Sequence, residues 1–284
     1  MSQTFQQLLG SKTQKAGNGE AVVILQMRDT LMNALGVAHG GIHYHLCATA
    51  IKAAAGEGML ELECSIEYFS PLQLTDTARA LGYVDRDGKT LVFAHAELYV
   101  GERLTAYMSA ILLRSQEQDL FGEVVASPSM LGPRSRPDPS VVFALEENIC
   151  DPKYTGSEAF LKMMFCYNLG SELVKRLKGS LVISVQLDEK YTDTEGAIDS
   201  SFFGIISDSA LGLTSYSNGD KTVTIKLTTR LYKKAEPSTV LRCRADVTSE
   251  IGRLVYVDGS LWDNEALVGS CSGVFYRIGD ESLS

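Results

Sequence analysis

The stretch Gly36-Val37-Ala38-His39-Gly40-Gly41 opens an apolar segment that runs to Ala48-Thr49-Ala50, and a second copy of this arrangement lies 160 residues later. The second copy reads Gly196-Ala197-Ile198-Asp199-Ser200-Ser201 and runs to Asp208-Ser209-Ala210. The first copy has a His-Gly-Gly turn but an alanine nine residues after its histidine. The second copy has lost the turn but carries an aspartate at that later position. Self-similarity at a fixed offset indicates a duplication. Because each copy keeps what the other has lost, we expect one working site built from both.

The apolar pattern upstream of the motif supports the duplication at the same offset. Residues 20–26 align with residues 180–186 without a gap. A chain of 284 residues is long enough for two domains of about 115–130 residues each. We therefore expect an N-terminal domain over residues 1–115, a linker over 116–150 with several prolines among serines, and a C-terminal domain over 151–284.

Each half reads as a strand, an apolar helix and four further strands. The helices expected over 39–55 and 199–215 are apolar nearly all round, which is typical of buried helices. Turn signals such as Asp87-Gly88 separate the strands. Leading helices are expected at 4–9 and at 157–177 from apolar residues at helical spacing. The expected strands cover 20–28, 59–69, 74–85, 89–100 and 103–114 in the first half, and 180–189, 221–233, 238–250, 252–262 and 265–277 in the second.

Composition narrows the class of protein further. No apolar run reaches the ~18 residues expected of a membrane helix, and the first residues resemble no secretory signal. Six cysteines without Cys-x-x-Cys spacing fit reduced thiols in a cytoplasmic protein. A net charge of −9 argues against nucleic-acid binding.

Asn33, Gly36, His39, Gly40 and Gly41 resemble the Asn-x-x-Gly-x-x-His-Gly-Gly signature of hotdog acyl-CoA thioesterases of the phenylacetate-degradation type. The resemblance covers about 115 residues of each half. It implies an α+β fold, a tandem or double hotdog: two long antiparallel sheets, each wrapped around a buried central helix, form an intramolecular pseudo-dimer. Two such units side by side can also make one continuous sheet.

The same resemblance implies roles for individual residues. In that family one protomer supplies the Asn and the His-Gly-Gly turn, and the other supplies an acid on its central helix and a strand hydroxyl. Carried over, the turn maps to Asn33, His39, Gly40 and Gly41, the acid to Asp208 and the hydroxyl to Thr224. The reciprocal site, defined here by Ala48, Asp193, Asp199, Ser200 and Ser201, lacks both the helix acid and the glycine turn, so we expect it to be vestigial.

These residue types suit thioester hydrolysis. The N–H groups at a helix N-terminus have no intrahelical partner and carry the positive end of the dipole. The N–H of Gly40, with or without that of Gly41, would bind the developing oxyanion. Asp208 would attack the carbonyl directly or deprotonate a water, and both options stay open. Asn33 and His39 would orient the carbonyl or the water, and Thr224 would hold the water. No metal or redox cofactor is required.

Simpler interpretations exist for the same residues. His39 could only cap a helix, Asp208 could be a buried hydrogen-bonding partner, and Thr224 could be an ordinary strand residue. His39 and His43 have zinc-binding spacing, but no nearby acid completes a ligand set. The phosphates of CoA would meet three cations after the Thr224 strand, namely Arg230, Lys233 and Lys234.

We therefore predict a cytoplasmic acyl-CoA thioesterase without a cofactor, which binds neither nucleic acid nor membranes and can pair into a homodimer. Two rivals remain. One is a hotdog hydratase or dehydratase that uses His39 as its base, and the other is a non-catalytic acyl-CoA-binding protein.

Overall fold

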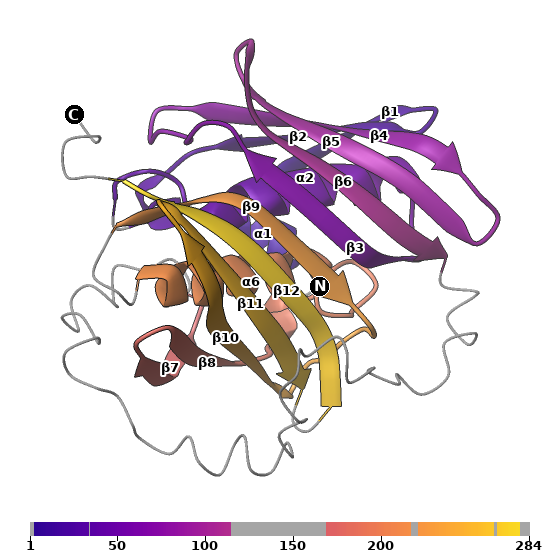
Figure 1. The fold of residues 1–284 in the computed structure, drawn as a ribbon. Coiled ribbons are helices and arrows are strands. Elements are labelled where there is room, and N and C mark those ends of the chain that lie inside the picture. The colour runs from indigo at the N-terminus through magenta and orange to yellow at the C-terminus, as the bar shows by residue number, and fades with distance from the viewer. Residues whose placement is uncertain (1–2, 34, 115–168, 217–220, 264–265, 279–284) are drawn as a thin grey trace.

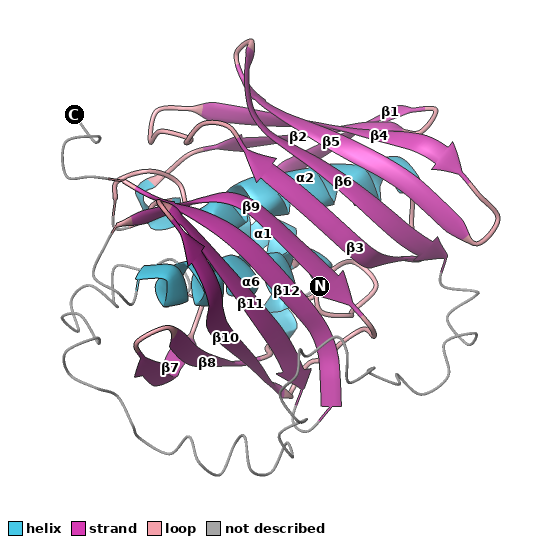
Figure 2. Ribbon diagram, in the orientation of Figure 1, coloured by secondary structure: helices cyan, strands magenta, loops and turns pink. Residues whose placement is uncertain are grey.

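The computed structural model describes residues 3–33, 35–114, 169–216, 221–263 and 266–278. These residues form one antiparallel sheet of twelve strands, which curves around two long helices that lie on the same side of it (Figure 1; Figure 2). The strands follow the order β1-β2-β4-β5-β6-β3-β9-β12-β11-β10-β8-β7. The first six belong to residues 12–114, here called the first half, and the last six to residues 171–277, the second half.

The two halves repeat the same elements in the same sequence. The first half follows the short helix α1 (Phe5–Leu9) and contains β1 (Lys12–Gly17), β2 (Glu20–Gln26), η1 (Asp29–Leu31), α2 (Gly40–Ala55), β3 (Met59–Tyr68), β4 (Thr77–Asp87), β5 (Leu91–Val100) and β6 (Arg103–Arg114). In the second half they are β7 (Ser171–Leu177), β8 (Ser180–Gln186), η4 (Glu189–Tyr191), α6 (Ser200–Ser215), β9 (Thr222–Leu231), β10 (Val240–Ile251), β11 (Leu254–Asp263) and β12 (Ala266–Arg277). The offset of 160 residues holds from β2 to the central helix. It becomes 163 from β3 onward (59 to 222), which places the insertion between α6 and β9.

Strands β3 and β9 join the halves into one sheet. Glu63 lies opposite Arg230 and Glu67 opposite Lys226, and both pairs form ion pairs on the outer face. The sequence analysis described two long sheets; the structure shows them continuous at this seam, as two units side by side allow.

The central helices form the core beneath the sheet. Ile42 and Leu46 of α2 and Ile205 and Ile206 of α6 are completely buried. The helices also pack on each other, and a Cβ at Gly41 would lie only 2.7 Å from the Cα of Ile205. Glycine at this position therefore permits the close crossing that brings the start of α2 against the middle of α6.

Most predicted elements are confirmed, with two differences. The helix expected over 157–177 is wrong over its last part, because Ser171–Leu177 is strand β7; the rest of it lies outside the described residues. Gly170, with φ +71°, makes a turn just before this strand. Strand β1 was not predicted, because its sequence Lys-Thr-Gln-Lys-Ala-Gly has no apolar alternation; it lies at the edge of the sheet.

The helix expected at 4–9 is present, with Thr4 as its N-cap in a capping box with Gln7. The proposed linker, 116–150, lies outside the described residues. Within the described part of the chain, no helix has both the length and the apolar character needed to cross a bilayer.

Candidate active site

Asp208 is held at the junction of the two halves. It is the ninth residue of α6, its side chain is 5% exposed, and its Oδ2 accepts the N–H of Gly41 at 3.0 Å. The hydroxyl of Thr224, on β9, donates to Oδ1 at 2.9 Å. A carboxylate from the second half therefore faces the glycine turn of the first half, with two donors that fix its plane.

Gly40 lies directly under this carboxylate. A Cβ there would be 2.7 Å from Oδ2 and 3.0 Å from Oδ1 of Asp208, so any side chain would displace the acid. Gly40 is also the first residue of α2, where a backbone N–H has no intrahelical acceptor. The N–H of Gly41 is already bound to Asp208. Gly40 is therefore the better placed of the two glycines to bind an oxyanion.

His39 has both a capping and a site role. It is the N-cap of α2, and its Nδ1 accepts the N–H of Gly41 at 3.0 Å. The same Nδ1 lies 3.3 Å from Oδ2 of Asp208. Burial lowers the pKa of His39, and the charge of Asp208 offsets this only in part. The imidazole is therefore neutral near pH 7.

Asn33 shapes the turn before the motif. Its Oδ1 accepts the N–H groups of Leu35 at 2.8 Å and Val37 at 3.4 Å. In the second half Asp193 accepts the N–H of Glu195 in the same way, at 2.9 Å. The structure thus shows a turn-forming role for Asn33, which is common to both halves, and leaves its predicted role in orienting the carbonyl as a prediction.

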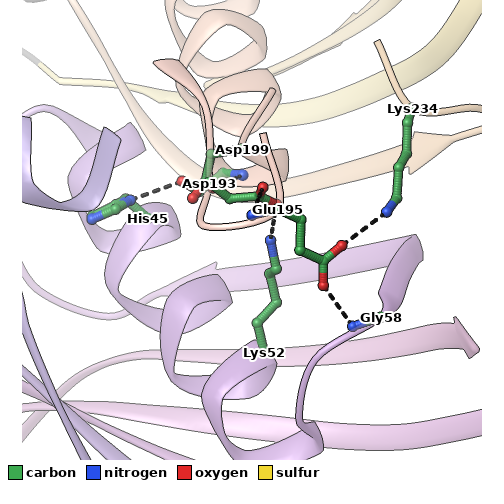
Figure 3. Close-up of polar contacts among 8 residues, drawn as sticks. His45, Lys52, Gly58, Asp193, Glu195, Asp199 and Lys234 are labelled. Atoms are coloured by element: carbon green, nitrogen blue, oxygen red, sulfur yellow. Dashed lines mark hydrogen bonds and ion pairs between the residues drawn. The ribbon is translucent and has the colours of Figure 1, made fainter. Parts of the chain in front are cut away.

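The reciprocal site is arranged around a lysine. Lys52 reaches from α2 to Asp193, with its Nζ 3.2 Å from Oδ2 (Figure 3). Asp199, at the position of His39, caps α6 and accepts both the N–H and the hydroxyl of Ser201, which also contacts His45. Burial opposes the charge on Lys52, but Asp199 and the other nearby carboxylates outweigh it and raise the pKa of the ammonium.

Glu61 is the counterpart of Thr224 in this reciprocal site. Its partner on β6 is Leu112 and that of Thr224 on β12 is Phe275, again 163 residues apart. Glu61 and Ser200 line a small cavity of about 20 Å³ beside Lys52, enough for about one water. Burial raises the pKa of Glu61 to about 7.

The three cations predicted to bind CoA lie away from Asp208. Lys233 and Lys234 line the cavity of the reciprocal site, and Lys234 pairs with Glu195. Arg230 pairs with Glu63 and lies six residues, about 20 Å, along β9 from Thr224. Binding of CoA phosphates by these side chains stays a prediction.

Sequence reasoning missed Ser209, whose hydroxyl lies 3.1 Å from Nε2 of His39. A residue adjacent to Asp208 on a helix gives no sequence signal for the direction in which it points. It also missed Lys52, although this is the one charged residue of α2. Among the described residues, no group of three or more His, Cys, Asp or Glu side chains is arranged to hold a metal ion.

Solved thioesterase structures share this fold over nearly the whole chain. A tesB protein from Mycobacterium avium subs. paratuberculosis matches with a TM-score of 0.67 and 11% identity, over 94% of this chain and 96% of that one. The acyl-CoA thioesterase II TesB2 from Mycobacterium marinum matches with a TM-score of 0.65 and 9% identity, over 98% of each chain. No family model and no curated protein matches the sequence. At such low identity the likeness establishes the fold.

Proposed function

We propose that this chain is a double hotdog protein that hydrolyses acyl-CoA thioesters at one composite site, made of Asn33, His39, Gly40, Gly41, Asp208 and Thr224. The observation that carries the proposal is the contact between the two halves: the carboxylate of Asp208 lies against the helix start at Gly40 and Gly41. The thioesterase structures that share the fold support the same reaction class.

The chemistry follows from the positions of these groups. The thioester oxygen would accept the N–H of Gly40, where the positive end of the α2 dipole stabilises developing negative charge. Asp208 would then attack the carbonyl carbon, or take a proton from a water that attacks it. In the second route the water would donate to Asp208 and to the hydroxyl oxygen of Thr224, which are hydrogen-bonded to each other at 2.9 Å. In the first route the carbon–sulfur bond breaks, the CoA thiolate leaves, and a water then hydrolyses the mixed anhydride to release the carboxylic acid and free Asp208. In the second route the water adds to the carbonyl carbon, the carbon–sulfur bond breaks, and the proton held by Asp208 passes to the leaving CoA thiolate.

One site per chain is part of the proposal. The reciprocal site has Ala48 where the composite site has Asp208, and Ser200 where it has Gly40. Lys52 occupies the position that corresponds to Gly212, one turn beyond the acid, so the reciprocal site carries a long charged side chain where the composite site has none. We expect one acyl-CoA to bind per chain.

A panel of acyl-CoA esters with a readout of free thiol tests the proposal. Release of free CoA thiol supports thioester hydrolysis, whether or not the reaction begins with a burst. Hydration of an enoyl-CoA without CoA release would favour the hydratase, and tight binding without either reaction would favour the binding protein. Homodimer formation and a cytoplasmic location stay predictions from the sequence.

A further inference from the structure

We propose that Ser209 is a positioning residue that fixes the proton of the His39 imidazole on Nε2, so that Nδ1 faces Asp208 as a hydrogen-bond acceptor. The proposal rests on the proposed thioesterase function, in which Asp208 must accept a proton. It concerns a residue that lies next to the acid in sequence but acts through the histidine of the other half.

The first argument is the direction of the Ser209 hydroxyl. Its Oγ lies 2.8 Å from the carbonyl oxygen of Ile205, one turn earlier in α6, and must donate to it because a carbonyl can only accept. A hydroxyl has one proton. Its contact with His39 Nε2, at 3.1 Å, must therefore use an Oγ lone pair, and the proton between them belongs to Nε2.

The contacts of Nδ1, at the opposite edge of the ring, also place the proton on Nε2. The N–H of Gly41, which is shared with Oδ2 of Asp208, also points at Nδ1 of His39 from 3.0 Å, and a backbone N–H can only donate. Nδ1 must therefore present a lone pair. These two contacts are tied to helices, since Ser209 is bonded to its own helix and Gly41 begins α2. Burial keeps the ring neutral, so that it carries one proton.

The tautomer matters because Nδ1 lies 3.3 Å from Oδ2 of Asp208. If Nδ1 carried the proton, it would donate to the carboxylate, stabilise its charged form and weaken it as a base. With Nδ1 as an acceptor, its one lone pair, which the Gly41 N–H also contacts, accepts a hydrogen bond from Asp208 only after Asp208 has taken the proton from water. It then stabilises the protonated acid, which makes Asp208 a stronger base at the moment of reaction.

The reciprocal site has no counterpart of this arrangement. Asp199 replaces His39, and Thr49 stands at the position of Ser209. A carboxylate cap has no tautomer to select. The contact between Ser209 and His39 therefore belongs to the composite site, whereas in the reciprocal site Ser201 contacts Nδ1 of His45 at 2.8 Å.

The wild-type tautomer is tested directly by ¹⁵N NMR of the full-length protein, whose four histidines give a simple imidazole spectrum. We expect the His39 signals of a ring protonated at Nε2 and bare at Nδ1 at neutral pH. A ring protonated at Nδ1 would overturn the proposal. This readout does not depend on turnover, so it separates failure of the proposal from absence of thioesterase activity.

The variants Ser209→Ala, Ser209→Thr and Ser207→Ala complete the test. Ser209→Ala should lower kcat about tenfold, a part of the ~10²–10⁴-fold contribution of a positioned base, with KM unchanged. It should also shift the acidic limb of the pH–rate profile to lower pH. Ser209→Thr keeps a hydroxyl that can donate one turn back and should restore both.

Ser207→Ala is the matched control, because Ser207 is a buried serine of the same helix whose hydroxyl has no hydrogen-bond partner among the described residues. It should leave the tautomer, kcat and pH profile as in the wild type. If Ser209→Ala lowers kcat without changing the tautomer or the acidic limb, Ser209 is merely structural and the proposal is wrong.

Discussion

Replacing Asp208 with asparagine removes the proposed base while keeping its shape. The amide oxygen can still accept the N–H of Gly41, and the amide nitrogen can donate to the hydroxyl oxygen of Thr224, so both existing contacts survive in number. Both become neutral rather than charge-assisted. We therefore expect about 1 kcal/mol lower stability and an intact fold.

The effect on the reaction should be far larger. A positioned base contributes ~10²–10⁴-fold to the rate, which is about 2.7–5.4 kcal/mol of activation free energy at ~1.36 kcal/mol per tenfold. The whole of this should appear in kcat, because the amide cannot accept a proton at neutral pH. The assay measures CoA thiol release against acyl-CoA concentration, with thermal unfolding recorded on the same samples.

Asp199→Asn is the matched control. Asp199 caps the equivalent helix of the reciprocal site, and asparagine is an equally good N-cap. Its kcat should stay close to that of the wild type. If Asp208→Asn lost less than about tenfold in kcat, the carboxylate would be neither base nor nucleophile, since either role requires more.

Three other predictions concern Gly40, Thr224 and Glu61. Gly40→Ala keeps the backbone N–H but should lower kcat at least ~10²-fold, the scale of losing a positioned base, because its Cβ would displace Asp208; a near-normal kcat in steady-state assays would contradict this. Thr224→Val should lower kcat about tenfold by removing one charge-assisted hydrogen bond, whereas Thr224→Ser should retain most activity. Glu61 has a folded-state pKa of about 7, raised above its usual value of 4.5, so the folded state binds more protons and stability falls as the pH rises between these values. Glu61→Gln should therefore stabilise the protein relative to wild type by more at pH 8 than at pH 5, by up to about 3 kcal/mol in the free energy of unfolding, which appears as a larger increase in Tm at pH 8. An equal increase in Tm at both pH values would refute the raised pKa of Glu61.

Much of the fold could be predicted because the same apolar periodicity and turn residues occur in both halves of the sequence. The apolar helices at 40–55 and 200–215 and the four strands after each were found from periodicity and turn residues, and the structure has them within a few residues. Strand β1 was not found because its sequence lacks apolar alternation, and β7 was predicted as the end of a helix. Their existence depends on pairing with β2 and β8, which no local pattern encodes.

The composite site was predictable for a different reason. Complementary losses in the two copies pointed to Asp208 and the glycine turn, and the structure brings these groups together. The role of Asn33 in its turn and the neighbours of Lys52 depend on how side chains meet across the two halves. Lys233 and Lys234 were assigned to the composite site because they lie close to Thr224 in sequence, but in the structure they line the cavity of the reciprocal site.

The seam between β3 and β9 has an evolutionary consequence. If two identical chains met there, every substitution would appear twice, and a lysine introduced at position 52 would enter both active centres at once. Covalent fusion breaks that constraint. One half can then hold a charge cluster around Lys52 while the other half keeps the glycine turn of the proposed site.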